Sequence, residues 1–224
     1  MKYNNSRQQD PQLISYITLR KAVGILGILF PVVIVGGSFI IGGCEEIQSN
    51  LSTYYHTRMR DLFVGILCAI ALFLFAYKGY TRIDSIAGNV ACVFAILVAF
   101  FPTSTTEPLT SCILNPYENN ISSSIHFLSA GGFFLTMAYF SIFLFTKKEP
   151  NSTRMKLKRN RVYRICGYII LGSILLMAVF YSLDKYKVLP DLTRYDPILW
   201  LETLALWAFG VSWLVKGRTI LTDK

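Results

Sequence analysis

The stretch that decides the fold is AVGILGILFPVVIVGGSFIIGG, residues 22–43. It runs for 22 residues without a charged side chain, and its apolar residues are continuous instead of recurring on one helix or strand face. A helix crosses the hydrocarbon core of a bilayer in about 20 residues, so this run predicts a membrane-spanning helix. It is too long for the apolar part of a typical signal peptide, and no A-x-A cleavage site follows it. We therefore expect the segment to be retained.

Five further apolar runs follow along the chain. Transmembrane backbone must satisfy its own hydrogen bonds, so it forms helices or closed barrels, and these runs are too long and too unalternating for barrel strands. The sequence therefore predicts an all-α polytopic membrane protein with six transmembrane helices in one bundle. The expected spans are 22–43, 56–77, 85–102, 126–146, 163–183 and 197–215. The bundle would occupy residues 21–216, between a polar N-terminal tail (1–20) and a C-terminal tail (217–224); residues 13–19 either lie at the interface or extend the first helix.

The net charge of +9 is unevenly distributed. Segment 147–164 is rich in Lys and Arg, whereas segment 103–125 contains neither. Because basic residues accumulate in cytoplasmic loops, both termini and loops 78–84 and 147–162 are expected in the cytoplasm, an N-in and C-in topology. We expect the basic residues to act chiefly as a topology signal, with contact to anionic head groups of membrane lipids as the alternative, and this distribution argues against nucleic acid as a partner.

The five cysteines divide in the same way. Cys68, Cys92 and Cys166 fall inside predicted spans and are expected to pack as small apolar residues. Cys44 and Cys112 both fall on the predicted outer side, where an oxidising compartment would allow a disulfide between them.

Most of the ionisable residues near the bilayer boundary fall at the predicted outer end. His56 and His126 begin spans two and four, and Glu202 lies inside span six. Ser52, His56 and Arg60 have the spacing i, i+4, i+8 and would share one face of a helix that begins near Ser52. Ionisable groups in a membrane are costly and usually face the bundle interior or a wet cavity. The pattern predicts a polar cavity that opens outward.

Three interpretations of this group remain open. In the first, His56, His126 and a carboxylate bind a metal such as zinc, and Ser52 or Arg60 steadies an oxyanion. In the second, the same groups form a binding pocket or a proton relay. In the third, they are a satisfied structural network in which Arg60 pairs with a carboxylate. The candidates are Ser52, Arg60 and Asp61 as catalytic residues and His56, His126 and Glu202 as metal ligands, with Asp61 or Glu45 as alternative carboxylates.

Three segments resemble a family of small bacterial six-helix membrane proteins catalogued as a domain of unknown function. They are LSTYYHTRMRDLFVGILCAIALFLFAYKGY (51–80), DSIAGNVACVFAILVAFFPT (84–103) and HFLSAGGFFLTMAYF (126–140). The S-x-Y-Y run, the R-D-x-F-V-G step and the terminal F-P-T look alike. The resemblance implies six helices and a bacterial inner membrane, and it implies no activity.

A second likeness is to the membrane hydrolases typified by alkaline ceramidases, which hold zinc through a Ser-x3-His helix, an aspartate and a later His-x3-His. Ser52 and His56 match the first element, but this chain has no His-x3-His, so His126 and Glu202 would have to substitute. We therefore expect an outward-facing polar cavity that binds or processes a lipid-like or small amphipathic ligand, with metal-assisted hydrolysis as one mechanism. A small proton-coupled transporter and a non-catalytic membrane scaffold are the alternatives.

Overall fold

The computed structural model describes residues 11–105, 109–147, 153–185 and 195–221. Over these residues the chain is helical and forms no strand; one isolated bridge joins Thr105 to Tyr117. The elements, in chain order, are α1 (Pro11–Ile40), the 3₁₀ helix η1 (Leu51–His56), α2 (Arg60–Ala76), α3 (Arg82–Phe100), α4 (Asn120–Tyr139), the π-helical turn η2 (Phe140–Leu144), α5 (Arg154–Lys185) and α7 (Pro197–Lys216).

Five helices in the described part of the chain are long and apolar enough to cross a membrane. They span Tyr16–Ile40, Arg82–Phe100, Asn120–Leu144, Arg154–Leu183 and Pro197–Lys216. Helix α2, which corresponds to the second expected span, has 17 residues and is shorter than these. The prediction of a helical chain is confirmed over the described residues, and five of its helices have the length and composition that a membrane span requires.

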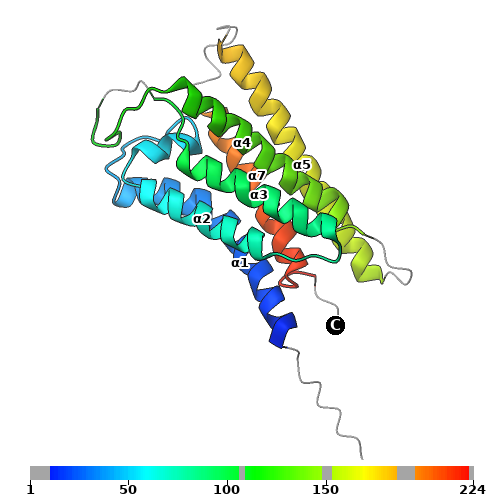
Figure 1. Cartoon of the computed structure of the whole chain (residues 1–224). Coiled ribbons are helices and arrows are strands. Elements are labelled where there is room, and N and C mark those ends of the chain that lie inside the picture. The colour runs from blue at the N-terminus through cyan, green and yellow to red at the C-terminus, as the bar shows by residue number, and fades with distance from the viewer. Residues whose placement is uncertain (1–10, 106–108, 148–152, 186–194, 222–224) are drawn as a thin grey trace, which may run out of the picture.

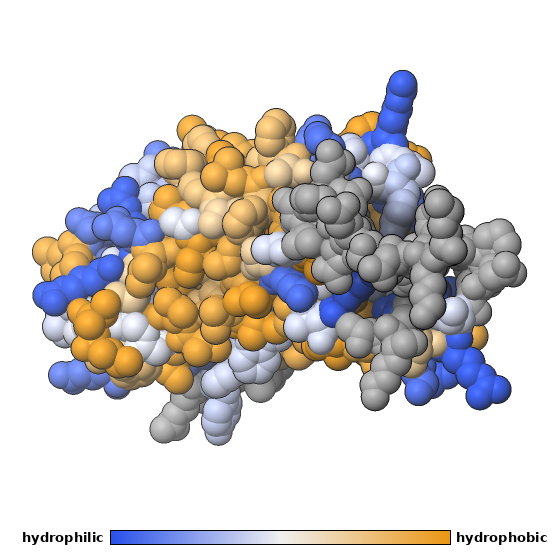
Figure 2. Space-filling model, turned by 90° about the horizontal axis from the view of Figure 1, so that it is seen from below, coloured by the Kyte–Doolittle hydropathy of each residue, from blue (hydrophilic) through white to orange (hydrophobic). Residues whose placement is uncertain are grey.

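One face of the molecule carries the kind of apolar band that a bilayer requires. Figure 2 shows a face on which hydrophobic residues form a wide band with hydrophilic residues on either side. Within its most apolar window, α5 has 22% of its residues buried, against 56% for α7. Helix α7 is therefore the most buried of the five apolar helices, and α5 is the most exposed.

The helices form a closed ring in which each packs on its neighbours in sequence and α7 packs on both α5 and α1 (Figure 1). Glycines bring α1 and α7 close together: a Cβ at Gly24 would lie 2.8 Å from the carbonyl oxygen of Gly210, and a Cβ at Gly210 would lie 2.7 Å from that of Gly24. Small residues at such a contact let two helices pack closely.

The two ends of the bundle differ. The segments that follow α1 and α3 lie at one end, and the start of α1 and the end of α7 lie at the other (Figure 1). Cys44 and Cys112 form a disulfide that joins those two segments, so the suggested pairing is confirmed. We call the end of the bundle that carries this bond the disulfide end.

At the opposite end, an ion pair with a buried carboxylate links α3 to Lys147, in the segment that follows η2. Thr81 and Asp84 form a capping box at the start of α3, and the Nζ of Lys147 lies 2.9 Å from Oδ2 of Asp84. The carboxylate thus receives both backbone and ammonium donors, which compensates its burial.

Several helices begin earlier than the sequence predicted. Helix α1 starts at Pro11, inside the expected tail, and continues through Pro31. Helix α5 starts at Arg154, so part of the expected basic loop is helical. Helix α4 starts at Asn120 because the side chain of Asn119 accepts hydrogen bonds from the backbone N–H groups of Ile121 and Ser122. Polar helical turns therefore extend beyond the apolar runs that predicted the spans.

Candidate functional site

The 3₁₀ helix η1 lies across the disulfide end of the bundle and is held there by its first residues. The side chain of Asn50 caps it by accepting from the N–H of Thr53, at 2.9 Å. The N–H of Leu51 donates to Oε2 of Glu202 on α7, at 2.6 Å. Tyr54 is fully buried, its hydroxyl accepts from the N–H of Gln48, and burial raises the pKa of its phenol. These contacts fix the orientation of Ser52 within η1.

One expectation from the sequence is wrong: Ser52, His56 and Arg60 do not share a helix face. Thr57 has an extended backbone and ends η1, and α2 begins only at Arg60. A 3₁₀ helix has three residues per turn, so residues i and i+4 point about 120° apart. The hydroxyl of Thr57 donates to the carbonyl of Tyr54 and accepts from the N–H of Met59, which stabilises the break.

Ser52 instead pairs with His126 on α4. The Oγ of Ser52 lies 2.8 Å from Nε2 of His126, and Nδ1 of His126 lies 2.7 Å from the carbonyl oxygen of Phe101. A carbonyl oxygen only accepts, so Nδ1 must carry the proton and donate to it. Nε2 of the neutral ring then has its lone pair directed at Ser52, whose hydroxyl donates to it. Both side chains are buried.

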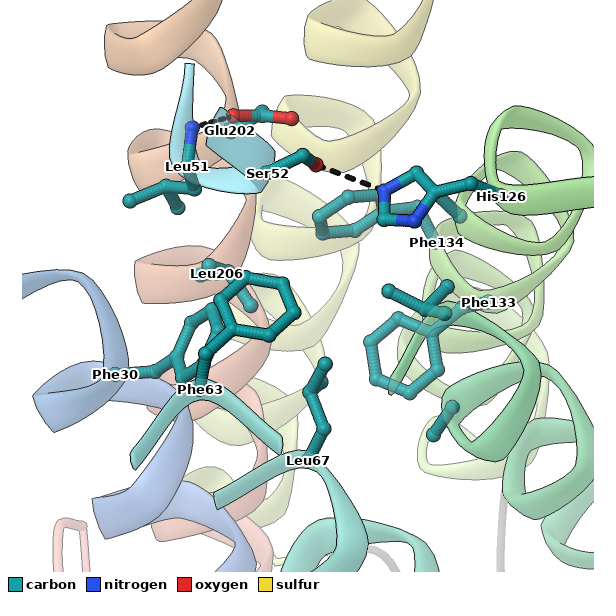
Figure 3. Close-up of a pocket in the computed structure, with 13 residues that line it drawn as sticks. Phe30, Leu51, Ser52, Phe63, Leu67, His126, Phe133, Phe134, Glu202 and Leu206 are labelled. Carbon is teal, nitrogen blue, oxygen red and sulfur yellow. Dashed lines mark hydrogen bonds between the residues drawn. The ribbon is translucent and has the colours of Figure 1, made fainter. Parts of the chain in front are cut away.

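This pair forms the polar end of an otherwise apolar cavity (Figure 3). The cavity has a volume of about 50 Å³, which is room for a few water molecules. Its polar lining comes from Ser52, His126 and Glu202. Aromatic and aliphatic side chains complete the wall: Phe30, Leu51, Phe63, Leu67, Ala95, Val98, Ala130, Phe133, Phe134 and Leu206.

His56 takes a different role from the one expected. Its Nε2 lies 2.8 Å from the carbonyl oxygen of Thr103 and its Nδ1 lies 3.0 Å from that of Asn115, and the ring is 2% exposed. A carbonyl oxygen only accepts, so a ring nitrogen that carries a proton can donate to the carbonyl it faces. His56 therefore clamps the segment between α3 and α4 over the end of α2.

The residues proposed as metal ligands do not fit a metal. Both ring nitrogens of His56 face carbonyl oxygens, and those of His126 face a carbonyl and a hydroxyl. One carboxylate oxygen of Glu202 already accepts from Leu51. In the part of the chain that the structure describes, no three His, Cys, Asp or Glu side chains are grouped so that they could hold a metal ion.

The other candidates lie outside the cavity. Arg60 and Asp61 are exposed at the start of α2, and the guanidinium of Arg60 stacks 4.9 Å from the ring centroid of Tyr55. The expected inward direction of Arg60 is therefore wrong, since the end of η1 at Thr57 places it on the rim. Glu45 lines a separate polar hollow at the surface of the disulfide end, with Glu46 and Asp196.

The carbonyl group of Phe101 is the part of the site that sequence reasoning missed. Phe101 precedes Pro102, and a residue before proline is driven out of the helical conformation. Its backbone is extended, with φ −110° and ψ 97°, so its carbonyl leaves the direction of α3 and can accept from His126. The F-P step after an apolar run was the available signal.

No family model, characterised protein or solved structure matches this chain.

Proposed function

We propose that the protein is a six-span membrane hydrolase that cleaves a lipid-like ester or amide near the outer surface of the bilayer through Ser52 and His126. The observation that carries this proposal is the hydrogen bond between Ser52 Oγ and His126 Nε2, at the polar end of an apolar cavity. A serine and a histidine base within hydrogen-bond reach, with the base oriented by a third group, are the arrangement that activates a serine nucleophile.

The proposed topology counts α2 as a span, with both termini in the cytoplasm. Its 17 residues extend about 25 Å at 1.5 Å per residue, close to the thickness of the hydrocarbon core, and it packs between α1 and α3. The disulfide supports an outward-facing disulfide end, because disulfides persist in oxidising compartments such as the bacterial periplasm. The resemblance to bacterial six-helix proteins favours an inner membrane.

The proposed reaction proceeds in two steps. Ser52 Oγ forms a bond to the carbonyl carbon of the substrate while its proton passes to Nε2 of His126. The bond from the carbonyl carbon to the leaving oxygen or nitrogen then breaks, and His126 returns the proton to that leaving group. Water then gives a proton to His126 and its oxygen forms a bond to the carbonyl carbon of the acyl-serine. The bond from that carbon to Ser52 Oγ breaks, the acid is released, and His126 returns the proton to Ser52 Oγ.

The orienting group is a backbone carbonyl and not a carboxylate. The carbonyl of Phe101 holds Nδ1 in the protonated form and leaves Nε2 free to act as the base. A neutral acceptor stabilises the imidazolium less than a carboxylate would, so we expect slow turnover.

The test is hydrolysis by the purified protein in vesicles that contain diacyl lipids, lysolipids or N-acyl lipids, followed by release of fatty acid. Ser52→Ala is expected to abolish release. Ser122→Ala is the matched control, because Ser122 is also buried at this end but its hydroxyl donates to the carbonyl of Pro102. Release that is equal in the wild-type protein and Ser52→Ala would exclude the proposed nucleophile.

A further inference from the structure

A second cavity lies between α4, α5 and α7, and it is apolar. Its volume is about 300 Å³, at the lower end of the range of ligand pockets. Helix α4 contributes Phe127, Ala130, Gly131 and Phe134, helix α5 contributes Ile174, Met177, Ala178 and Tyr181, and helix α7 contributes Ile198 and Glu202. We call it the α4–α5 groove.

The groove follows the helix axes from the disulfide end inward. Phe127 and Phe134 are seven residues apart on α4, and so are Ile174 and Tyr181 on α5, which corresponds to about 10 Å along each helix. One wall is α5, the least buried of the five apolar helices. Leu175 and Val179, next to the lining residues on α5, are exposed apolar side chains. The groove therefore lies beside the surface that contacts lipid.

The groove meets the cavity of the Ser52–His126 pair. Ala130, Phe134 and Glu202 line both, so the two spaces share a wall formed by these side chains. Glu202 is also the one carboxylate in either lining, and the N–H of Leu51 holds it at the junction. A molecule in the groove would have an apolar wall along its length and polar groups at one side.

We propose that the α4–α5 groove binds one acyl chain of a bilayer lipid, with the polar end of the lipid toward Glu202 and the chain toward Phe134 and Ile174. The groove is apolar and shares a wall with a polar site, and these two features match the two ends of a lipid. Its position beside the exposed face of α5 gives a chain access from the bilayer without passage through water. Acyl-chain binding in the groove would give the proposed hydrolase a substrate class and a binding site. The binding itself does not depend on the proposed function, whereas the hydrolysis of the bound lipid does.

Gly131 provides a specific way to fill the groove. A Cβ at this position meets no other heavy atom within 4 Å, so Gly131→Leu projects into open space and not into a neighbouring helix. Gly65 on α2 is the matched control: a Cβ there also meets nothing within 4 Å, and Gly65 lines neither cavity. The two variants carry the same change in helix composition, and only one occupies the groove.

The experiment uses the full chain in vesicles of phosphatidylethanolamine and phosphatidylglycerol that contain a trace of phosphatidylglycerol with a diazirine near the end of one acyl chain. After illumination, labelled residues are located by peptide mass spectrometry. We expect labelling of the segment from Phe127 to Phe134, a loss of about tenfold in Gly131→Leu, equivalent to about 1.4 kcal/mol of binding, and unchanged labelling in Gly65→Leu. Equal labelling in both variants, or labelling confined to exposed residues such as Leu175, would overturn the proposal.

One further variant separates this inference from the proposed reaction. Ser52→Ala leaves the groove lining intact, so the photolabel on α4 is expected to be unchanged. Labelling that depends on Gly131 in a protein without hydrolytic activity would uphold the groove and reject the hydrolase. Hydrolysis that persists in Gly131→Leu, with labelling equal to that of Gly65→Leu, would uphold the hydrolase and reject the groove as the binding site.

Discussion

The Oγ of Ser52 and the Nε2 of His126 lie 2.8 Å apart, although 74 residues separate them in sequence. Ser52 belongs to a short 3₁₀ helix and His126 to the second turn of α4. The two meet because η1 is capped by Asn50 and anchored to α7 through Glu202, while α4 begins six residues before His126. The relationship therefore depends on three separate helix ends.

Loss of the His56 clamp is predicted to destabilise the protein. His56→Ala leaves the carbonyls of Thr103 and Asn115 without their donor, which costs roughly 1–3 kcal/mol for each group that stays buried. Thermal unfolding in detergent should show a lower midpoint than for the wild-type protein. Arg58→Ala, a change at a nearby exposed residue, should leave the midpoint unchanged.

The disulfide is predicted to contribute strongly to stability. It closes a loop of 68 residues, and its removal in a Cys44→Ala, Cys112→Ala double variant is expected to cost about 2–4 kcal/mol. Chemical unfolding of the two proteins in the same detergent measures the difference. Cys92→Ala removes a free thiol inside α3 and serves as the control. Equal stability of the double variant and the wild-type protein would show that the bond does not constrain the unfolded chain.

The contact between α1 and α7 is predicted to tolerate no added side chain. In Gly210→Ala, the new Cβ would lie 2.6 Å from Cγ1 of Ile28 and 2.7 Å from the carbonyl oxygen of Gly24, so the helices must separate, at a cost of typically 1–3 kcal/mol. Gly65→Ala adds the same methyl group in open space and should be neutral or slightly stabilising. Unfolding midpoints of the two variants in one detergent provide the comparison.

The topology can be tested with single cysteines in intact cells. Glu118→Cys lies at the disulfide end and Lys158→Cys lies near the start of α5, and both positions are exposed. An impermeant maleimide should label Glu118→Cys from outside and Lys158→Cys only after the membrane is opened. Labelling in the opposite order would invert the orientation, and labelling of both from outside would contradict the six-span count.

Much of the fold follows from the length of the apolar runs, because a bilayer leaves the backbone few alternatives to a helix. The run from Arg60 to Ala76 shows where this reasoning weakens. Polar residues before it suggested a continuous helix from Ser52, but hydrogen bonds of Thr57 to its neighbours break the chain into η1 and α2. Local side-chain contacts of this kind do not register in hydropathy.

The candidate site was predicted in part. Sequence placed Ser52, His126 and Glu202 near one another, and the structure brings them to one cavity. The sequence did not show that His56 lies apart from this group, because the carbonyl partners of His56 belong to the backbone of a distant segment. Backbone groups carry no signature in sequence unless a residue such as Pro102 redirects them.

The most direct test of the central claim is covalent modification of Ser52 by a long-chain alkyl fluorophosphonate. The serine oxygen forms a bond to phosphorus and fluoride leaves, so peptide mass spectrometry locates the adduct and its rate of formation. We predict an adduct at Ser52 in the folded protein and the same rate of formation in Ser122→Ala. In His126→Gln, which lacks the base, the rate should fall by a factor of about 100 or more. An unmodified Ser52, or an equal rate in His126→Gln, would show that the pair is a structural hydrogen bond and not a reactive site.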